Sequence, residues 1–118
     1  MKRMAILAAA LSCSGCMSVA TLGVSALAMN HPVPAPNCPP LKQTVRVVSD
    51  FELIDTCGPF AEACAVISFE RGTCEILHTG YLLPLMLEHE REHCRCHDHI
   101  GSSVLADRLA AWRKERQQ

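Results

Sequence analysis

Six cysteines beyond residue 37 limit the folds that this 118-residue chain can adopt. They follow a long apolar N-terminal segment and form an even set: Cys38, Cys57, Cys64, Cys74, Cys94 and Cys96. On a short exported chain such a set predicts disulfides, because oxidising compartments preserve them. A domain of roughly 90 residues buries a small fraction of its surface, so cross-links or a metal ion must supply the missing few kcal/mol of stability. We therefore expect one small domain held by disulfides.

The pairing of these cysteines is open, because six cysteines allow 15 pairings and the sequence does not choose among them. Cys64 and Cys74 flank an expected hairpin and are predicted to meet across it. Cys94 and Cys96 would then form disulfides with Cys38 and Cys57 and so connect the helix to the N-terminal segment. The rival interpretation is that the thiolates of Cys94 and Cys96 bind a metal themselves, which an oxidising compartment disfavours.

The N-terminal segment has the form of an export signal. Lys2 and Arg3 precede an uncharged, mostly apolar run from Met4 to Met29, long enough for a signal peptide or a single membrane span. A small-x-small site ends at Ala28, and the surroundings of Cys16 resemble the lipidation site of bacterial lipoproteins. Three outcomes stay open: cleavage after Ala28, lipidation at Cys16, or retention as an N-terminal anchor. Each places the domain in the bacterial periplasm or at the membrane of the cell envelope.

The sequence divides into three expected parts. Residues 1–28 form the export signal or N-terminal anchor. Residues 29–41 are rich in proline and predict an extended, polyproline-like linker. Residues 42–118 form a single small domain. Beyond residue 28 the charges sum to mildly acidic, so no basic surface is expected to hold nucleic acid.

Three strands are predicted from alternating and β-branched patterns. Val45–Val48 alternates as a strand does, and the runs Ala63–Phe69 and Thr73–Leu77 flank Glu70-Arg71-Gly72, which predicts a hairpin turn. An edge strand of such a sheet can bind an extended peptide by backbone pairing, and the candidates are Thr73–Leu77 and Val66–Phe69. The ordinary alternative is a hairpin that only covers a helix.

Two helices are expected after the sheet. Pro84 suits the first turn of a helix that runs to about Arg95. Ser102 or Ser103 can cap a last helix in which three apolar residues share one face: Leu105, Leu109 and Trp112. This order predicts an α+β fold, a small antiparallel sheet packed on the first of these helices, plus a C-terminal helix.

The first of these helices carries two histidines four residues apart, in the sequence His89-Glu90-Arg91-Glu92-His93. Residues i and i+4 lie on the same helical face, so both imidazoles can direct a nitrogen at one ion about 2 Å away. Glu90 lies about 100° round the helix, where it can accept a proton from a water that the ion activates. The motif predicts a catalytic Zn2+ site. The alternatives are a structural or regulatory metal site and a plain charged surface helix.

The longer pattern His89-Glu90-x-x-His93-x-x-Cys96-x-x-His99 resembles the extended zinc motif of the metzincins, within the broader zincin metallopeptidases. In that family a glycine between the second and third histidines lets the chain turn back toward the ion, and Cys96 occupies this place. A non-glycine residue adopts the required left-handed conformation at a cost of roughly 1 kcal/mol. The family also has a methionine turn, and no methionine follows His99. The resemblance implies a minimal, disulfide-stapled zincin-like domain.

Two histidines compete for the third ligand position. An unbroken helix would align His89, His93 and His97, but the last ring would stand roughly 6 Å further along the axis, too far to close round one ion. We therefore expect His99 to be the third ligand and keep His97 as the alternative. His97 is otherwise expected to support a ligand or face the substrate, and Asp98 to orient a histidine ring.

The resemblance implies a small exported zinc-dependent hydrolase, in the first place a metallopeptidase that acts on a peptide or protein substrate in the cell envelope. The three histidine ligands would hold Zn2+ and Glu90 would act as the base. Tyr81 and His78 are the nearest candidates in sequence to stabilise an oxyanion. The chain is short for a peptidase domain, and an envelope partner protein is one way to complete the cleft. The alternatives are a non-catalytic metal-binding protein and a disulfide-stapled envelope interaction protein.

Overall fold

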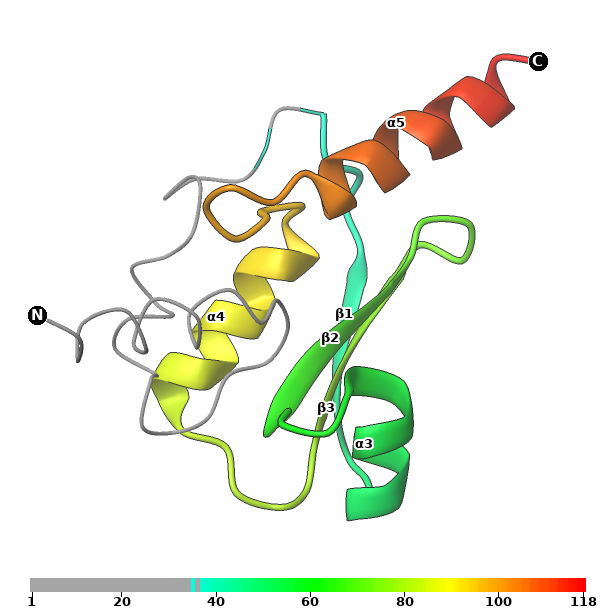
Figure 1. Ribbon diagram of the computed structural model, residues 1–118. Coiled ribbons are helices and arrows are strands. Elements are labelled where there is room, and N and C mark those ends of the chain that lie inside the picture. Colours follow the sequence, from blue (N-terminus) through cyan, green and yellow to red (C-terminus); the bar gives the residue numbers. More distant parts are fainter. Residues whose placement is uncertain (1–34, 36) are drawn as a thin grey trace, which may run out of the picture.

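The structure is a computed structural model that describes residues 35 and 37–118, and it contains one small sheet with helices on both faces (Figure 1). The elements in chain order are β1 (Lys42–Val47), α3 (Asp50–Cys57), β2 (Ala63–Ser68), β3 (Thr73–His78), α4 (Pro84–Cys94) and α5 (Val104–Arg116). The predicted leader, its Cys16 and most of the linker lie outside the described residues. The proposed division of the chain at residues 28 and 41 therefore stays a prediction.

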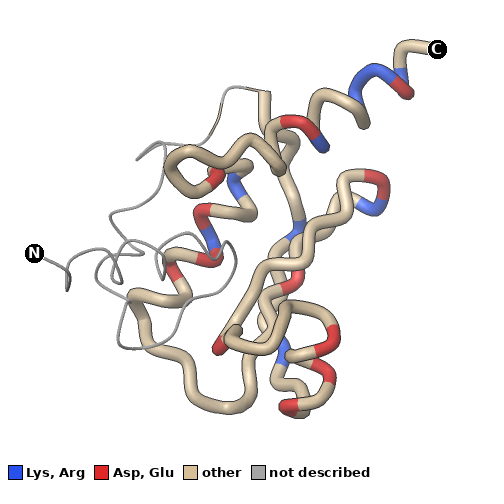
Figure 2. Tube along the Cα trace, in the orientation of Figure 1, with Lys and Arg blue, Asp and Glu red and all other residues tan. Residues whose placement is uncertain are grey.

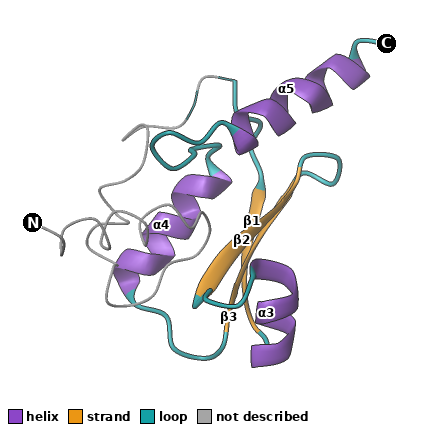
Figure 3. Ribbon diagram, viewed as in Figure 1, coloured by secondary structure: helices purple, strands orange, loops and turns teal. Residues whose placement is uncertain are grey.

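The sheet is mixed, with the strand order β1-β3-β2. β2 and β3 form the expected antiparallel hairpin, in which Cys64 lies opposite Leu77 and Ile67 opposite Cys74. β1 pairs in parallel with β3, so the prediction of an antiparallel sheet is wrong for this strand. The reason is helix α3, which crosses from the end of β1 to the start of β2 past the end of the central strand (Figure 3).

Helix α3 is an addition to the predicted elements. The side chain of Ser49 caps it by accepting a hydrogen bond from the backbone N–H of Glu52 at 3.1 Å. The helix is capped at its C-terminal end by Gly58, whose φ of 102° costs glycine little. Leu53 is the buried residue of the helix and packs with Val48 and Leu77 under one face of the sheet.

The opposite face of the sheet carries the main core. Successive residues of a strand point to opposite faces, so Leu77 faces α3 while Ile76 faces α4. The buried members of this larger cluster come from β2, β3 and the two C-terminal helices: Ile67, Phe69, Cys74, Ile76, Cys94, Cys96, Leu105 and Leu109. Helix α4 is thereby fixed against the sheet along one side.

The positions of the two C-terminal helices agree with the sequence prediction, but the side chain of Ser103, the N-cap residue of α5, makes no capping hydrogen bond. Helix α4 begins at Pro84, as expected for proline in a first turn, and ends at Cys94. Helix α5 follows Ser103 and buries Leu105 and Leu109, while Trp112 lies with its ring centroid 5.6 Å from that of Phe69. The C-terminal end of α5 extends away from the sheet (Figure 1). Acidic and basic residues are interspersed along both helices (Figure 2).

All six cysteines of the domain form disulfides, which confirms the predicted staples: Cys38–Cys96, Cys57–Cys64 and Cys74–Cys94. The predicted Cys64–Cys74 pair is wrong, and with it the pairing of Cys57 with the C-terminal cysteines. Cys64 and Leu77 share the α3 face of the hairpin, whereas Cys74 and Ile67 share the α4 face. Each cysteine therefore bonds to the segment on its own face.

No helix within the described part of the chain is long and apolar enough to cross a membrane. The three disulfides are consistent with an oxidising environment, such as that of an exported protein.

Candidate metal centre

Three histidines converge at the end of α4. His89 and His93 come from the helix and His99 from the loop that follows it, and one ring nitrogen of each lies within 4.8 Å of the others. The Nε2 atoms of His89 and His99 are 3.0 Å apart. Two imidazoles on one tetrahedral zinc ion would hold their nitrogens roughly 3.3 Å apart, given Zn–N bonds of about 2 Å. The donor set therefore fits a metal ion.

His97 is not part of this cluster, but it contacts one of the three histidines through its backbone. Its side chain is fully buried, and its Nδ1 lies 2.5 Å from Oε2 of Glu92. Its backbone oxygen lies 2.7 Å from Nδ1 of His93. Because a carbonyl oxygen can only accept, Nδ1 of His93 carries the proton and its Nε2 offers a lone pair to an ion. This geometry favours His99 over His97 as the third ligand.

The turn after α4 brings His99 back toward the helix. Two hydrogen bonds close it, from the N–H of Cys96 to the oxygen of His93 at 2.9 Å and from the N–H of His97 to the oxygen of Glu92 at 3.0 Å. This is the Schellman pattern, which needs a left-handed residue just past the helix. Cys96 is that residue, with a φ of 66°. A cysteine thus adopts the conformation for which glycine is usual.

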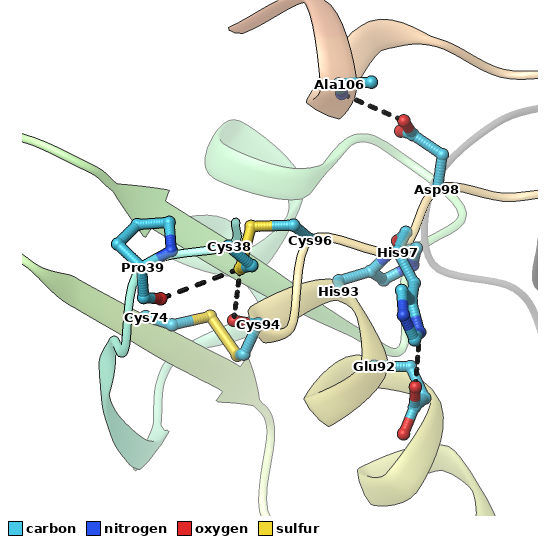
Figure 4. Close-up of a disulfide and its surroundings, with 10 residues drawn as sticks. All are labelled: Cys38, Pro39, Cys74, Glu92, His93, Cys94, Cys96, His97, Asp98 and Ala106. Atoms are coloured by element: carbon cyan, nitrogen blue, oxygen red, sulfur yellow. Dashed lines mark hydrogen bonds and ion pairs between the residues drawn. A yellow bond between two sulfur atoms is a disulfide. The ribbon is translucent and has the colours of Figure 1, made fainter. Parts of the chain in front are cut away.

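Asp98 anchors the far side of the same loop. Its carboxylate accepts hydrogen bonds from the backbone N–H groups of Leu105 at 2.9 Å and Ala106 at 3.0 Å, the latter drawn in Figure 4. The expectation that Asp98 orients a histidine ring is therefore wrong. The first N–H groups of α5 have no acceptor within the helix, and a helix N-terminus attracts a carboxylate. Asp98 therefore accepts from these groups instead of from a histidine ring. The loop that carries His99 is consequently held by both helices.

Burial favours the neutral form of two histidines of the cluster, His93 and His99. The pKa of His93 is lowered from 6.5 to about 4, mainly by burial and in addition by the nearby His99 ring. Burial also lowers the pKa of His99. A neutral imidazole is the form that binds a metal, so these rings are ready to bind one at neutral pH without losing a proton.

A pocket of about 250 Å³ opens beside the cluster. Its walls include Glu90, two histidines of the cluster (His93 and His99), residues of strand β2, and the start of α5 with Arg108. Glu90 is buried, with 1% of its surface exposed. The pocket therefore brings together the expected base, two of the expected ligands and an edge strand.

Strand β2 is an edge of the sheet, whereas β3 is paired on both sides. The prediction that Thr73–Leu77 binds an extended peptide is therefore wrong, because both of its edges are occupied. Of the two predicted segments, Val66–Phe69 remains, and most of it lies in β2. On β2 the backbone oxygen of Ile67 points outward, where Nη2 of Arg108 donates to it at 2.8 Å.

Arg108 is a pocket residue that nothing in the sequence marks, because a single arginine on a helix has no spacing signal. The oxyanion candidates Tyr81 and His78 do not line this pocket. Tyr81 is 77% exposed, and Nδ1 of His78 accepts a hydrogen bond from the N–H of Gly80 at 3.1 Å.

Comparison with protein-family models, with curated proteins and with solved structures finds no match for this chain. The functional assignment accordingly depends on the site itself.

Proposed function

We propose that this protein is a small exported zinc-dependent hydrolase, and that its reaction is peptide hydrolysis. The observation that supports this most directly is the convergence of His89, His93 and His99 at a pocket that also contains Glu90. Export is supported by the leader-like residues 1–28 and by the three disulfides.

The three imidazoles would hold the ion. Imidazole ligands suit zinc, copper, nickel and iron, and the histidine–glutamate spacing favours zinc among them. When bound, Zn2+ supplies a Lewis acid that polarises a carbonyl group and lowers the pKa of water to around 7. His97 would keep His93 in the correct tautomer through the contact of its backbone oxygen with Nδ1.

Glu90 would act as the general base. Glu90 lines the same pocket as His93 and His99 and is shielded from bulk solvent. In that position it would accept a proton from the attacking water and pass it to the leaving nitrogen.

An extended substrate would lie along the edge of β2. Residues 63, 65 and 67 alternate with those bonded to β3, so their backbone groups point outward. Because Arg108 already binds the oxygen of Ile67, substrate pairing would use the groups of Ala65. The other N–H groups of Arg108 would remain for a polar or acidic group of the substrate.

The substitution Glu90→Gln tests the proposal. It should lower hydrolysis of a mixed peptide library by about 100-fold or more while zinc stays bound at one ion per chain. Glu88→Gln is the matched control, because Glu88 lies on the same helix, is exposed and pairs only with Arg91 at 2.8 Å among the described ion pairs. Peptidase assays and elemental analysis provide the two measurements.

The two measurements separate the alternatives. Full activity of the Glu90→Gln protein would remove Glu90 from the mechanism. Stoichiometric zinc without hydrolysis in the wild type would indicate a metal-binding protein without turnover. A wild-type protein without affinity for metal would leave only a stapled interaction protein.

A further inference from the structure

The turn that delivers His99 contains an unusual combination, a left-handed cysteine that is also disulfide-bonded. Within the described residues only two positions other than glycine have positive φ, Asn37 and Cys96, both at 66°. Cys96 is bonded to Cys38, which follows Asn37 directly. One of these two residues is therefore part of the cross-link, and the other directly precedes the second cysteine of the same bond.

The segment that carries Cys38 is fitted to the end of α4. The N–H of Ala35 donates to the backbone oxygen of Arg95 at 3.2 Å. Sγ of Cys38 lies 3.9 Å from the backbone oxygen of Cys94, a contact that is drawn as a dashed line in Figure 4. Ala35, Cys38 and Leu41 pack against the main core. The cross-link thus joins the turn to a segment that is itself anchored.

The helix and the turn are held by different disulfides. Cys74–Cys94 fastens the last residue of α4 to the central strand, with a Cα–Cα distance of 5.6 Å. His89 and His93 lie on this helix, and their positions do not require Cys38. Loss of the Cys38–Cys96 bond would therefore act on the turn and on His99, the ligand that follows it.

We propose that the Cys38–Cys96 disulfide positions His99, in the role that a flexible glycine could otherwise fill, so that metal affinity depends on the oxidation of this bond. The inference rests on the proposed metal site. A residue with a β-carbon is disfavoured in the left-handed conformation by enough to shift an equilibrium roughly tenfold. The covalent link to an anchored segment holds Cys96 in that conformation, and the turn then delivers the third imidazole to the other two.

Two double variants of the full chain separate positioning from stability. Cys38→Ser/Cys96→Ser and Cys38→Ser/Cys96→Gly both lack the cross-link, but only glycine adopts the left-handed conformation without cost. Co2+ titration followed by visible absorption reports affinity and coordination number. The serine pair should bind Co2+ about tenfold more weakly than wild type, with a spectrum shifted toward that of His99→Ala. The glycine pair should recover most of the lost affinity.

Cys57→Ser/Cys64→Ser is the control, because it removes a cross-link between α3 and β2 that does not touch the turn. Its affinity should stay within about twofold of wild type. Wild-type affinity in the serine pair would overturn the proposal. Equal weakness of the glycine and serine pairs, or failure of both to fold, would show that the bond acts on overall stability and would also overturn it. A wild-type protein without Co2+ binding would overturn the proposed metal site itself.

Discussion

At the scale of single residues, His93 should make the stability of the metal-free protein depend on pH. Its pKa is about 4 in the folded, metal-free protein, against an ordinary value of 6.5. As the pH falls, the unfolded chain takes up the proton first, so the folded state loses stability between pH 6.5 and pH 4. The loss from this one group is about 3 kcal/mol, because each unit of pKa corresponds to about 1.4 kcal/mol.

Denaturant unfolding of the chelated protein at pH values from 7 to 4 measures this loss. His99 should contribute in the same direction, because burial lowers its pKa too. The His93→Gln protein should show a smaller pH dependence than wild type. An equal dependence in both proteins would assign the effect to other groups.

The residues of the cluster were largely accessible from the sequence, because they follow helix geometry. The i, i+4 spacing places His89 and His93 together, and the same geometry excludes His97 from their ion. The roles of Asp98 and Arg108 were not accessible. Asp98 binds N–H groups of a later helix and Arg108 binds the oxygen of Ile67, and neither contact has a local pattern.

At the scale of elements, the sheet shows what pattern can and cannot predict. The hairpin follows from two alternating runs around a glycine turn. The parallel pairing of β1 does not, because alternation says nothing about the direction of a neighbour. A signal for α3 was present, since Ser49-Asp50-Phe51-Glu52 has the spacing of a capping box. The Glu52 carboxylate, however, binds Arg46, which also binds Glu75 and so links α3, β1 and β3.

The cap of α5 by Asp98 gives a prediction at this scale. Asp98→Ala removes the acceptor for two backbone N–H groups and should lower the free energy of unfolding by about 1 to 2 kcal/mol. It should also weaken metal binding, because His99 is the next residue. Chemical denaturation and Co2+ titration measure the two effects.

Asp107→Ala is the comparison for this prediction. Asp107 lies in the first turn of α5 but is exposed, and it accepts only from the hydroxyl of Ser103 among the described hydrogen bonds. Its loss should cost less than that of Asp98. Equal costs for the two variants would show that Asp98 has no special role in joining the loop to the helix.

At the scale of the whole molecule, both the disulfides and a bound metal ion should stabilise the small folded domain. A ligand that binds only the folded state at 100 times its Kd adds about 2.7 kcal/mol. Zinc should therefore raise the Tm of the chelated protein by on the order of 10 °C. Differential scanning fluorimetry with EDTA and with zinc measures the shift.

The His89→Ala protein is the control and should show no response to zinc. A wild-type Tm that does not change between EDTA and zinc would mean that the disulfides alone maintain the fold. The stapled interaction protein would then be the better interpretation.

The general plan of the molecule was predictable, but its cross-links were not. Cysteine number and leader predict a small stapled domain, and helix signals locate α4 and α5. Disulfide pairing depends on which face of a sheet each cysteine occupies. Cys64 and Cys74 flank the same turn and yet point to opposite faces, a fact that depends on register and on the helices that cover each side.

The cross-link between Cys38 and Cys96 also orders events in time. Its two cysteines are 58 residues apart, and the second lies between the histidines that would hold the ion. A chain that is exported from its N-terminus must therefore wait for nearly the whole domain to emerge before this loop can close. If the proposed export and the proposed role of this bond are both correct, full affinity for the ion would be reached only after translocation and oxidation.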